Sequence, residues 1–563
     1  MVDELRGNPA SPGAAAGPVV RLTPPPVLPE HWDTPAAPEA ELAAATEALD
    51  AAVADLEKRA ASVSGESKSI MDTQIMMAQD PSLRTGISDA VAGGRPAAWA
   101  IRDAFGKHVA ALEAIGGYLG ERAADLIDIR DRAIAAALGL AQPGIPAVDG
   151  AFVLVGQDIA PADTVLLDPA KVLGIVTEKG GPTSHTAIVA RALGIPAVVG
   201  CAGAAGLADG QRIAVDGTRG TVAVDPDDDY VHRIEAEAAS LKEKLAAHSG
   251  PGATADGHPV KLLLNVGSAG GAATDAAADA EGVGLFRTEF LFLDRTEAPT
   301  VEEQRAAYGE VLRGFSGRQV VIRTLDAGAD KYIPFANTED EPNPALGVRG
   351  YRVGVRNPGL LTAQLEAISL AAGDHDADVR VMAPMIATPA EAAAFRELAR
   401  EHGIGKVGVM IEVPAAAIRA RDILAEVDFV SIGTNDLSQY TYAADRMLGE
   451  LGELLDPWQP ALLALVANVA AAAKEAGKPA GICGEAASDP GLAPVFAGLG
   501  ITSLSMSVSA VPAVRAALKD HTVEQCEILA AEVLRAPDVP SARKAVEEFS
   551  ARSVDQRSRD GES

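Results

Sequence analysis

One histidine lies in a stretch whose residue types suit phosphate chemistry. His185 follows Gly180 and Gly181 and stands between Ser184 and Thr186, at the start of a helix-like run. Glycines allow a tight turn close to a ligand, and the N-terminus of a helix attracts anions. A neutral imidazole has a lone pair that can attack phosphorus, and an ordinary pKa of about 6.5 leaves much of it neutral at pH 7. The stretch fits a phosphate-accepting histidine, and taken alone it fits equally well a capping turn with a surface histidine.

A second group of reactive residue types follows short apolar runs in the second half of the chain. Guanidinium groups bind phosphate and carboxylate through paired hydrogen bonds, and carboxylate oxygens suit Mg²⁺. A thiol with an ordinary pKa of about 8.5 is mostly protonated at pH 7 and can donate a proton to carbon. The candidates are four arginines, one amide, two carboxylates and one thiol: Arg287, Arg323, Arg349, Arg446, Asn435, Glu412, Asp436 and Cys483.

Each of these residues also has an ordinary structural interpretation. A single arginine is as well explained by a surface salt bridge, and a cysteine in a barrel is as well explained by inert core packing. Four arginines that all follow predicted strands in an acidic chain are harder to explain as scattered surface charge. Together they indicate a site for an anion with several negative charges.

The pattern around these residues predicts the scaffold that brings them together. Short apolar runs alternate with helix-like stretches, as in a (β/α)8 TIM barrel, whose active sites lie at the carboxyl ends of the strands. We predict this barrel over residues 253–545, with a polar tail over 546–563. The eight runs are Val260–Val266, Val283–Phe286, Gln319–Arg323, Val379–Ala383, Val407–Ile411, Asp428–Ile432, Pro479–Cys483 and Ile501–Met506.

The first half reads as a multidomain α/β arrangement around His185. Strand-like runs and turns predict an α/β domain built from residues 1–29 and 141–225. Apolar residues at helical spacing between them predict a four-helix subdomain over residues 30–140. A charged helix without a wide apolar face follows over residues 226–252, with a hinge candidate at its end. The strand-like runs are 18–22, 152–155, 172–176, 197–199 and 212–215.

Composition narrows the class of protein. A chain of 563 residues has room for two to four domains, and a net charge of −30 argues against nucleic acid and anionic membranes as partners. The same charge suits a small basic protein partner. The charged first ten residues and the lack of an eighteen-residue apolar run predict a cytoplasmic protein without membrane insertion. Three widely spaced cysteines indicate reduced thiols.

The motifs resemble those of a known family. Residues 180–191, Gly-Gly-x-Thr-Ser-His-x-x-Ile-x-Ala-Arg, resemble the phosphohistidine segment of the phosphoenolpyruvate-utilising enzymes. Further motifs extend the resemblance, in order, to enzyme I of the bacterial sugar phosphotransferase system. Departures are Pro182, where that family usually has Arg, Ala329, where it has Gly, and Val348, where it has Trp. The further motifs are Gly284-Leu-Phe-Arg-Thr-Glu-Phe-Leu, Met410-Ile-Glu-Val-Pro, Ser431-Ile-Gly-Thr-Asn-Asp-Leu-Ser and Gly481-Ile-Cys-Gly-Glu.

The resemblance implies an enzyme that moves the phosphoryl group of phosphoenolpyruvate to His185 and then to the phosphocarrier HPr, releasing pyruvate. The helical subdomain would bind HPr, the histidine domain would swivel, and the barrel would form a homodimer. Glu412 and Asp436 would bind Mg²⁺, and Cys483 would protonate the enolate. The substrate would be bound by Arg287, Arg323, Asn435, Asp436, Arg446 and Arg349.

Two alternatives stay in view. A dikinase or synthase relative would need an ATP-binding domain before the histidine, but the 184 residues preceding His185 are mostly helix-like and show no glycine-rich phosphate loop. A non-catalytic docking protein on the same scaffold would need neither the arginines nor Cys483. The enzyme is therefore the preferred hypothesis.

Overall fold

The computed structural model divides the chain into two compact units, Met1–Ser240 and Leu241–Ser563. The boundary falls inside helix α9 (Asp228–Ala246), which the sequence predicts as the linker helix. The described residues are 3–35, 37–60, 66–115, 123–146, 148, 150–159, 163, 167–181, 184–246, 248–267, 275–293, 295–327, 333–336, 341–445 and 448–560.

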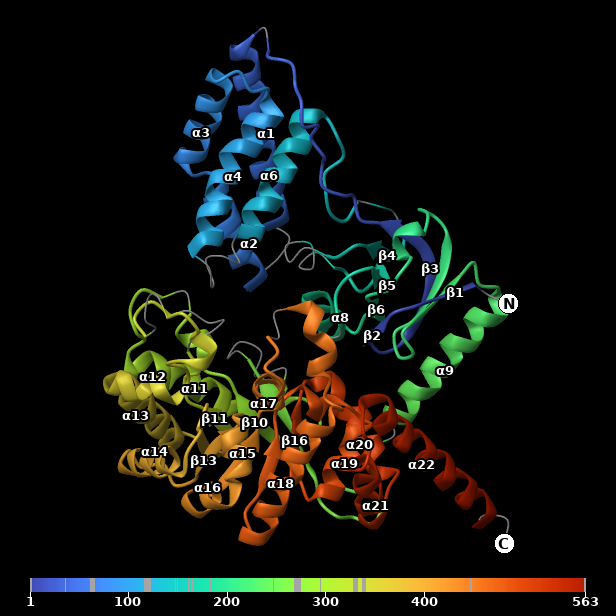
Figure 1. Cartoon of the computed structure of the whole chain (residues 1–563), viewed down its shortest axis with the longest axis vertical. Helices are drawn as coiled ribbons and strands as arrows, with labels where there is room; N and C mark the ends of the chain where they lie inside the picture. The colour runs from blue at the N-terminus through green and yellow to red at the C-terminus, as the bar shows by residue number, and fades with distance from the viewer. Residues whose placement is uncertain are drawn as a thin grey trace. The chain divides into compact units, whose positions relative to one another are not determined.

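An eight-stranded sheet forms the α/β part of the first unit (Figure 1), in the order β1-β8-β7-β3-β4-β5-β6-β2. Its central strands β3, β4, β5 and β6 run parallel, and antiparallel pairs extend the sheet at both ends. The five predicted strands are present, whereas three four-residue strands, β1, β2 and β8, were not predicted; β1 and β2 form the two edges of the sheet and lack a clear apolar pattern. The strands are β1 (Asp3–Arg6), β2 (Asn8–Ser11), β3 (Ala14–Arg21), β4 (Phe152–Gly156), β5 (Val172–Thr177), β6 (Ala197–Val199), β7 (Arg212–Asp216) and β8 (Thr221–Val224).

A helical bundle lies between β3 and β4 in the sequence. The prediction of four helices was wrong, because the described residues form five. The helix that was missed, α3, begins at Asp80, whose side chain accepts a hydrogen bond from the Ser82 backbone amide, and it buries only Leu83, Ile87 and Val91. The helices are α1 (Pro38–Ala60), α2 (Glu66–Ala78), α3 (Pro81–Ala92), α4 (Ala97–Ile115) and α6 (Ala123–Leu138).

The second unit is a closed barrel of eight parallel strands, with neighbours in the order β10-β11-β12-β13-β14-β15-β16-β9. The predicted fold class is confirmed, and each predicted run differs from its strand by no more than two residues at either end. The closed ring leaves no edge strand exposed. The strands are β9 (Lys261–Val266), β10 (Gly282–Phe286), β11 (Gln319–Arg323), β12 (Asp378–Ala383), β13 (Val407–Ile411), β14 (Phe429–Ile432), β15 (Ala480–Ile482) and β16 (Ser503–Met506).

Helices surround the barrel, and α22 continues through the predicted start of the polar tail at residue 546. The α-helices of this unit are α11 (Val301–Gly314), α12 (Tyr351–Arg356), α13 (Pro358–Asp374), α14 (Pro389–Glu401), α15 (Pro414–Ile418), α16 (Ala420–Glu426), α17 (Thr434–Tyr442), α18 (Pro460–Ala476), α19 (Leu492–Leu499), α20 (Val511–Lys519), α21 (Val523–Val533) and α22 (Val539–Asp560). Short 3₁₀ turns are η1 (Ala204–Gly206), η2 (Glu289–Leu291), η3 (Pro344–Leu346), η4 (Gly449–Leu455), η5 (Glu485–Ser488) and η6 (Val508–Ala510).

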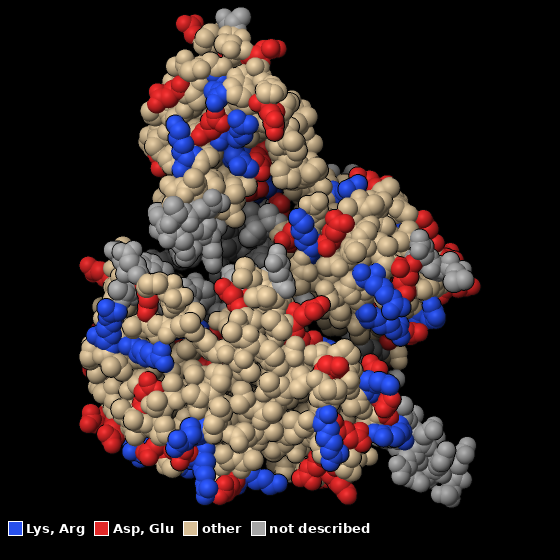
Figure 2. Space-filling view, viewed as in Figure 1, with Lys and Arg blue, Asp and Glu red and all other residues tan. Residues whose placement is uncertain are grey.

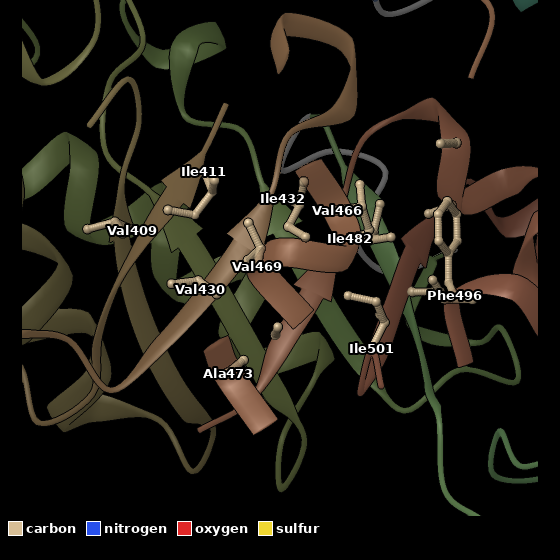
Figure 3. Close-up of a cluster of buried hydrophobic side chains, with 14 of the residues drawn as sticks. Val409, Ile411, Val430, Ile432, Val466, Val469, Ala473, Ile482, Phe496 and Ile501 are labelled. Atoms are coloured by element: carbon tan, nitrogen blue, oxygen red, sulfur yellow. The ribbon is translucent and has the colours of Figure 1, made fainter. Parts of the chain in front are cut away.

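Strand side chains that point away from the barrel axis pack against these helices. Ile432 and Ile482 lie against Val466 and Val469 of α18 in one buried cluster (Figure 3). Among the described residues, one segment, Leu451–Ala476, is long and apolar enough to cross a membrane by composition. It contains α18, whose apolar face the barrel buries, so core packing accounts for its composition.

A glycine makes the close contact between β10 and β11 possible, and this predicts a specific loss of stability. Gly282 has φ +140°, and a Cβ on it would lie 2.2 Å from the Gln319 carbonyl oxygen. Gly282→Ala should therefore destabilise the barrel by about 3 kcal/mol or more. Gly317→Ala is the matched control, because its φ is +72° but a Cβ there meets nothing within 4 Å, so the cost should be about 1–2 kcal/mol.

Unfolding in urea, followed by fluorescence, measures both variants. Trp458 is the only tryptophan of the second unit, so a Trp32→Phe, Trp99→Phe background makes the signal specific for the barrel. An equal loss in the two variants would show that the clash with Gln319 is relieved at little cost.

Candidate active site

The barrel brings most of the predicted residues to one end. Arg323 is the last residue of β11, Glu412 follows β13, and Cys483 follows β15. Asn435 and Asp436 lie in the first turn of α17, directly after β14. The prediction that polar residues gather at the carboxyl ends of the strands is therefore supported for the described residues, while Arg446 lies outside them.

Arg349 is at the centre of a buried network of charges. Its Nε and Nη2 donate to the two carboxylate oxygens of Asp326 at 3.3 and 3.2 Å. Its Nη1 donates to Asp436 Oδ1 at 2.8 Å and to the Tyr440 hydroxyl at 3.1 Å. Only 3% of Arg349 is exposed. An arginine held this way cannot leave its partners without stranding buried carboxylates, so it fixes the position of Asp436.

Arg323 continues this network toward β10. Its Nη2 donates to Glu289 Oε1 at 2.8 Å, and its Nη1 lies 3.2 Å from Asp326 Oδ2. The Asp326 amide also donates to Glu289 Oε1, at 3.1 Å. The buried Nε of Arg323 has no hydrogen-bond partner among the described residues. This guanidinium therefore keeps one donor for an anionic ligand.

The sequence prediction missed Glu289 and Asp326 as site residues. Both lie close to predicted arginines, two residues after Arg287 and three after Arg323. Buried arginines need carboxylate partners, so an acidic residue in the same loop was the available signal.

Glu412 is buried among other carboxylates. It is 1% exposed, and its Oε1 accepts a hydrogen bond from the Met385 amide at 2.6 Å. Burial, together with the nearby carboxylates of Asp436 and Asp326, raises the pKa of Glu412 well above its ordinary value. A divalent cation relieves this repulsion, so the donor set fits Mg²⁺. The described residues assemble no group of three or more His, Cys, Asp or Glu ligands.

Cys483 is held at the inner wall of the barrel. It is 2% exposed, and its thiol donates to the Ile432 carbonyl at 3.6 Å. Burial raises the pKa of this thiol to about 11, so it is protonated at neutral pH. A buried protonated thiol can serve as an acid toward a substrate carbon.

Two further candidates differ in their surroundings. Asn435 Oδ1 accepts a hydrogen bond from the Glu485 amide at 2.9 Å, which ties the loop after β14 to the loop after β15. Arg287 directly follows β10 and is half-buried, and its side chain makes no ion pair or hydrogen bond to a described residue. Its charge is therefore available to a ligand.

In the first unit, His185 is the first residue of α8 (His185–Leu193). Ser184 caps this helix by accepting a hydrogen bond from the Ala187 amide, and Thr186 donates to Asp158 at 3.1 Å. Gly180 has φ +92°, so the loop between β5 and α8 turns where the sequence predicts. The helix N-terminus beside His185 favours bound phosphate.

Comparison with known proteins defines the family. Residues 242–523 match the PEP-binding domain of the PEP-utilising enzymes, residues 148–220 their mobile domain and residues 6–122 their N-terminal domain. A phosphoenolpyruvate-protein phosphotransferase of Streptomyces coelicolor is 49% identical over 97% of this chain and 99% of its own length. Proteins of the same name from Haloferax volcanii and Staphylococcus carnosus are 40% and 33% identical over 85% and 98% of this chain, and over 86% and 99% of their own lengths.

The barrel, its charged end and the matched domains place the chain among the enzymes that use phosphoenolpyruvate. Within that class, the chain belongs to the family of phosphoenolpyruvate-protein phosphotransferases. The resemblance inferred from the motifs is confirmed.

The network predicts different roles for two arginines. Arg349→Ala leaves Asp326 and Asp436 buried with less compensation, so it should destabilise the barrel by about 3–5 kcal/mol. Arg287→Ala removes no ion pair with a described residue, so it should cost less than about 1 kcal/mol of stability. It should instead weaken phosphoenolpyruvate binding at least tenfold, as the loss of a charged hydrogen bond of about 1.5–3 kcal/mol does.

Urea unfolding followed by Trp458 fluorescence measures stability, and isothermal titration calorimetry measures phosphoenolpyruvate binding. The assignment is wrong if Arg287→Ala lowers stability as much as Arg349→Ala does.

Proposed function

We propose that the protein transfers the phosphoryl group of phosphoenolpyruvate to one ring nitrogen of His185, and from there to the small phosphocarrier protein HPr. Pyruvate is released, and the reaction begins sugar uptake by the phosphotransferase system. The observation that carries this proposal is the buried network joining Arg323, Arg349, Asp326 and Asp436 at the carboxyl end of the barrel. A docking protein does not need such a network, and the match to phosphoenolpyruvate-protein phosphotransferases supports the enzyme.

Arginines bind the substrate in this proposal. Arg287 has no described partner, and Arg323 keeps one buried donor, so both can bind the phosphate or carboxylate of phosphoenolpyruvate. Arg446 and Asn435 are proposed to complete the binding. Arg349 acts mainly by holding Asp326 and Asp436 in place.

Glu412 and Asp436 are proposed to hold Mg²⁺. When bound, Mg²⁺ neutralises negative charge on the substrate oxygens. The residues of the chain keep the geometry: the Met385 amide orients Glu412, and Arg349 orients Asp436. Loss of the phosphoryl group leaves an enolate, and Cys483 supplies the proton that turns it into pyruvate.

The histidine must meet both the barrel and the carrier protein. Phosphoryl transfer needs the reacting atoms about 3–3.5 Å apart, and one rigid arrangement cannot meet this condition for two partners. We place the hinges near Gly250 and within residues 140–150. The helical subdomain is proposed to bind HPr.

A second copy of the chain is proposed to bind the barrel, giving a homodimer in the cytoplasm. A shallow groove of about 510 Å³ lies among α15, α17 and α18, and Ile418 at its edge is 64% exposed. The face over α15 and α18 carries few charged side chains (Figure 2). Apolar exposed faces of this kind suit association with another protein surface.

Labelled phosphoenolpyruvate tests the phosphoryl acceptor. With Mg²⁺, the wild-type protein should acquire acid-labile, base-stable label at a single position, and mass spectrometry should place it on His185. His185→Ala should abolish this acid-labile label, because phosphate on the neighbouring Ser184 or Thr186 would be an acid-stable ester. His232→Ala on α9 is the matched control and should be labelled normally. Label persisting in His185→Ala would refute the assignment.

Removing one carboxylate tests the metal site. Glu412→Gln keeps the size of the side chain but removes a charge, so autophosphorylation should fall by about a thousandfold or more. Calorimetry should also show that Mg²⁺ no longer strengthens phosphoenolpyruvate binding. Glu397→Gln, at an exposed position on α14, is the matched control and should behave as wild type. An unchanged response to Mg²⁺ in Glu412→Gln would place the metal elsewhere.

A further inference from the structure

A second cavity lies at the end of the barrel opposite the candidate active site, with a volume of about 210 Å³. Its outer lining comes from residues that begin strands: Lys261 of β9, Gln319 of β11 and Ser503 of β16. Lys261 is exposed, so the cavity reaches solvent at this end. Its inner lining includes Ser431 and Ser505, which are 6% and 3% exposed. The cavity therefore runs from the surface into the barrel.

Small and hydroxyl-bearing residues keep this interior open. Bulky branched side chains usually fill the inside of a TIM barrel. Here Gly284 and Gly481 line the cavity, and a Cβ on them would lie 2.5 Å from Ser505 Oγ and 2.4 Å from Ser503 Oγ. The glycines thus leave space for hydroxyl groups. A cavity of this size has room for several water molecules, and the hydroxyl groups in its lining can hydrogen-bond to them.

An apolar layer separates the cavity from the active site. It consists of Leu285, Val321, Met382, Met410, Phe429 and Cys483, and two of its members also line the cavity. Ser431 provides a polar group beside this layer: it lines the cavity, and it pairs across β14 and β15 with Gly481, two residues before Cys483. It also directly precedes Ile432, whose carbonyl accepts a hydrogen bond from the Cys483 thiol, and its hydroxyl acts to lower the pKa of that thiol against the effect of burial. Ser505 bonds instead to Asn265, whose amide donates to the Cys483 carbonyl, so that connection ends on the backbone.

We propose that Ser431 and this cavity form the path by which Cys483 regains its proton from solvent after each turnover. The inference rests on the proposed role of Cys483 as the acid. Once Cys483 has given its proton to the enolate carbon, the sulfur is a buried thiolate, and the next turnover requires it to be protonated again. The active-site end must exclude water during phosphoryl transfer. A supply of protons from the opposite end of the barrel allows Cys483 to be reprotonated without admitting water to the active site.

The proton balance of the relay is simple. The Ser431 hydroxyl gives its proton to the Cys483 sulfur and takes one from a water molecule in the cavity. The hydroxide left behind is neutralised by a proton from bulk solvent through the mouth near Lys261. One proton enters for each pyruvate formed, and no oxidant or reductant is involved. Ser431 acts through Cys483, so it is a positioning and relay residue.

Rapid-quench measurement of pyruvate tests the relay, using the full-length protein with phosphoenolpyruvate, Mg²⁺ and excess HPr. Ser431→Ala should release one pyruvate per chain at the wild-type rate and then continue at least tenfold more slowly, because only reprotonation is impaired. The value of kcat should fall while kcat/KM for phosphoenolpyruvate stays within twofold of wild type. The slow phase should show a larger solvent deuterium isotope effect.

Three further variants test whether the effect depends on the Ser431 hydroxyl and on access through the cavity. Ser431→Thr keeps the hydroxyl and should restore most of the steady rate. Ser503→Ala is the matched control, because it removes a hydroxyl from the same cavity away from the sulfur, and it should show no burst. Ser503→Leu fills the mouth and should produce the burst while Ser431 is intact.

The experiment distinguishes failure of the relay from failure of the proposed role of Cys483 as the acid. A first turnover in Ser431→Ala that is slowed as much as later ones would mean that Ser431 only orients the thiol, which overturns the relay. Unchanged kinetics in Ser431→Ala, with pyruvate formation lost in Cys483→Ala, would also overturn the relay but keep Cys483 as the acid. Normal pyruvate formation by Cys483→Ala would overturn both.

Discussion

The sharing of Asp326 between two arginines is the constraint on which the rest of the site depends. Asp326 accepts from Arg349 through both of its oxygens, and it pairs with Arg323 at 3.2 Å. Arg323 reaches Glu289 after β10, and Arg349 reaches Asp436 after β14. One carboxylate therefore links loops that follow three different strands. Because these charges are buried, each must keep its partners, and the catalytic end of the barrel is stiff before any substrate arrives.

Much of the fold was predictable because the strands of a parallel barrel have a simple sequence pattern. Strands buried on both faces read as continuous apolar runs, and β11 and β13 were predicted to the residue. The short edge strands β1 and β2 carry charges, proline and small residues, so they lack that pattern. Helix α3 was overlooked because its buried stripe consists of three residues, although Asp80 and Pro81 are ordinary helix-start signals.

The site was predictable in its residue types but not in its pairings. An arginine at a strand end indicates an anion, yet the sequence alone does not show that Arg349 would point at Asp326 and Asp436 while Arg287 keeps no described partner. That difference depends on which loops meet across the barrel, and it appears only in three dimensions. The sequence departs from the family's motif at Val348, next to Arg349, yet the contacts of Arg349 make it the most heavily bonded arginine of the described site.

The apolar layer inside the barrel divides the interior into two environments. On one side lie the buried arginines and carboxylates, and on the other lies a cavity whose lining includes glycines and serine hydroxyls. Cys483 belongs to the layer itself. In the proposed relay, this position lets the Cys483 sulfur receive a proton from the cavity side and donate it to the substrate on the active-site side.

Closure of the barrel has a consequence for the synthesis of the protein. Strand β9 begins at Lys261, and its last partner, β16, ends at Met506, so they pair only after about 240 intervening residues have been made. A ribosome adding about 5–20 residues per second needs on the order of 10–50 s for that stretch. Throughout that interval β9 has an unpaired edge, and the inward-facing residues have no closed wall around them. Chaperones that shield strand edges should therefore matter most for this half of the chain.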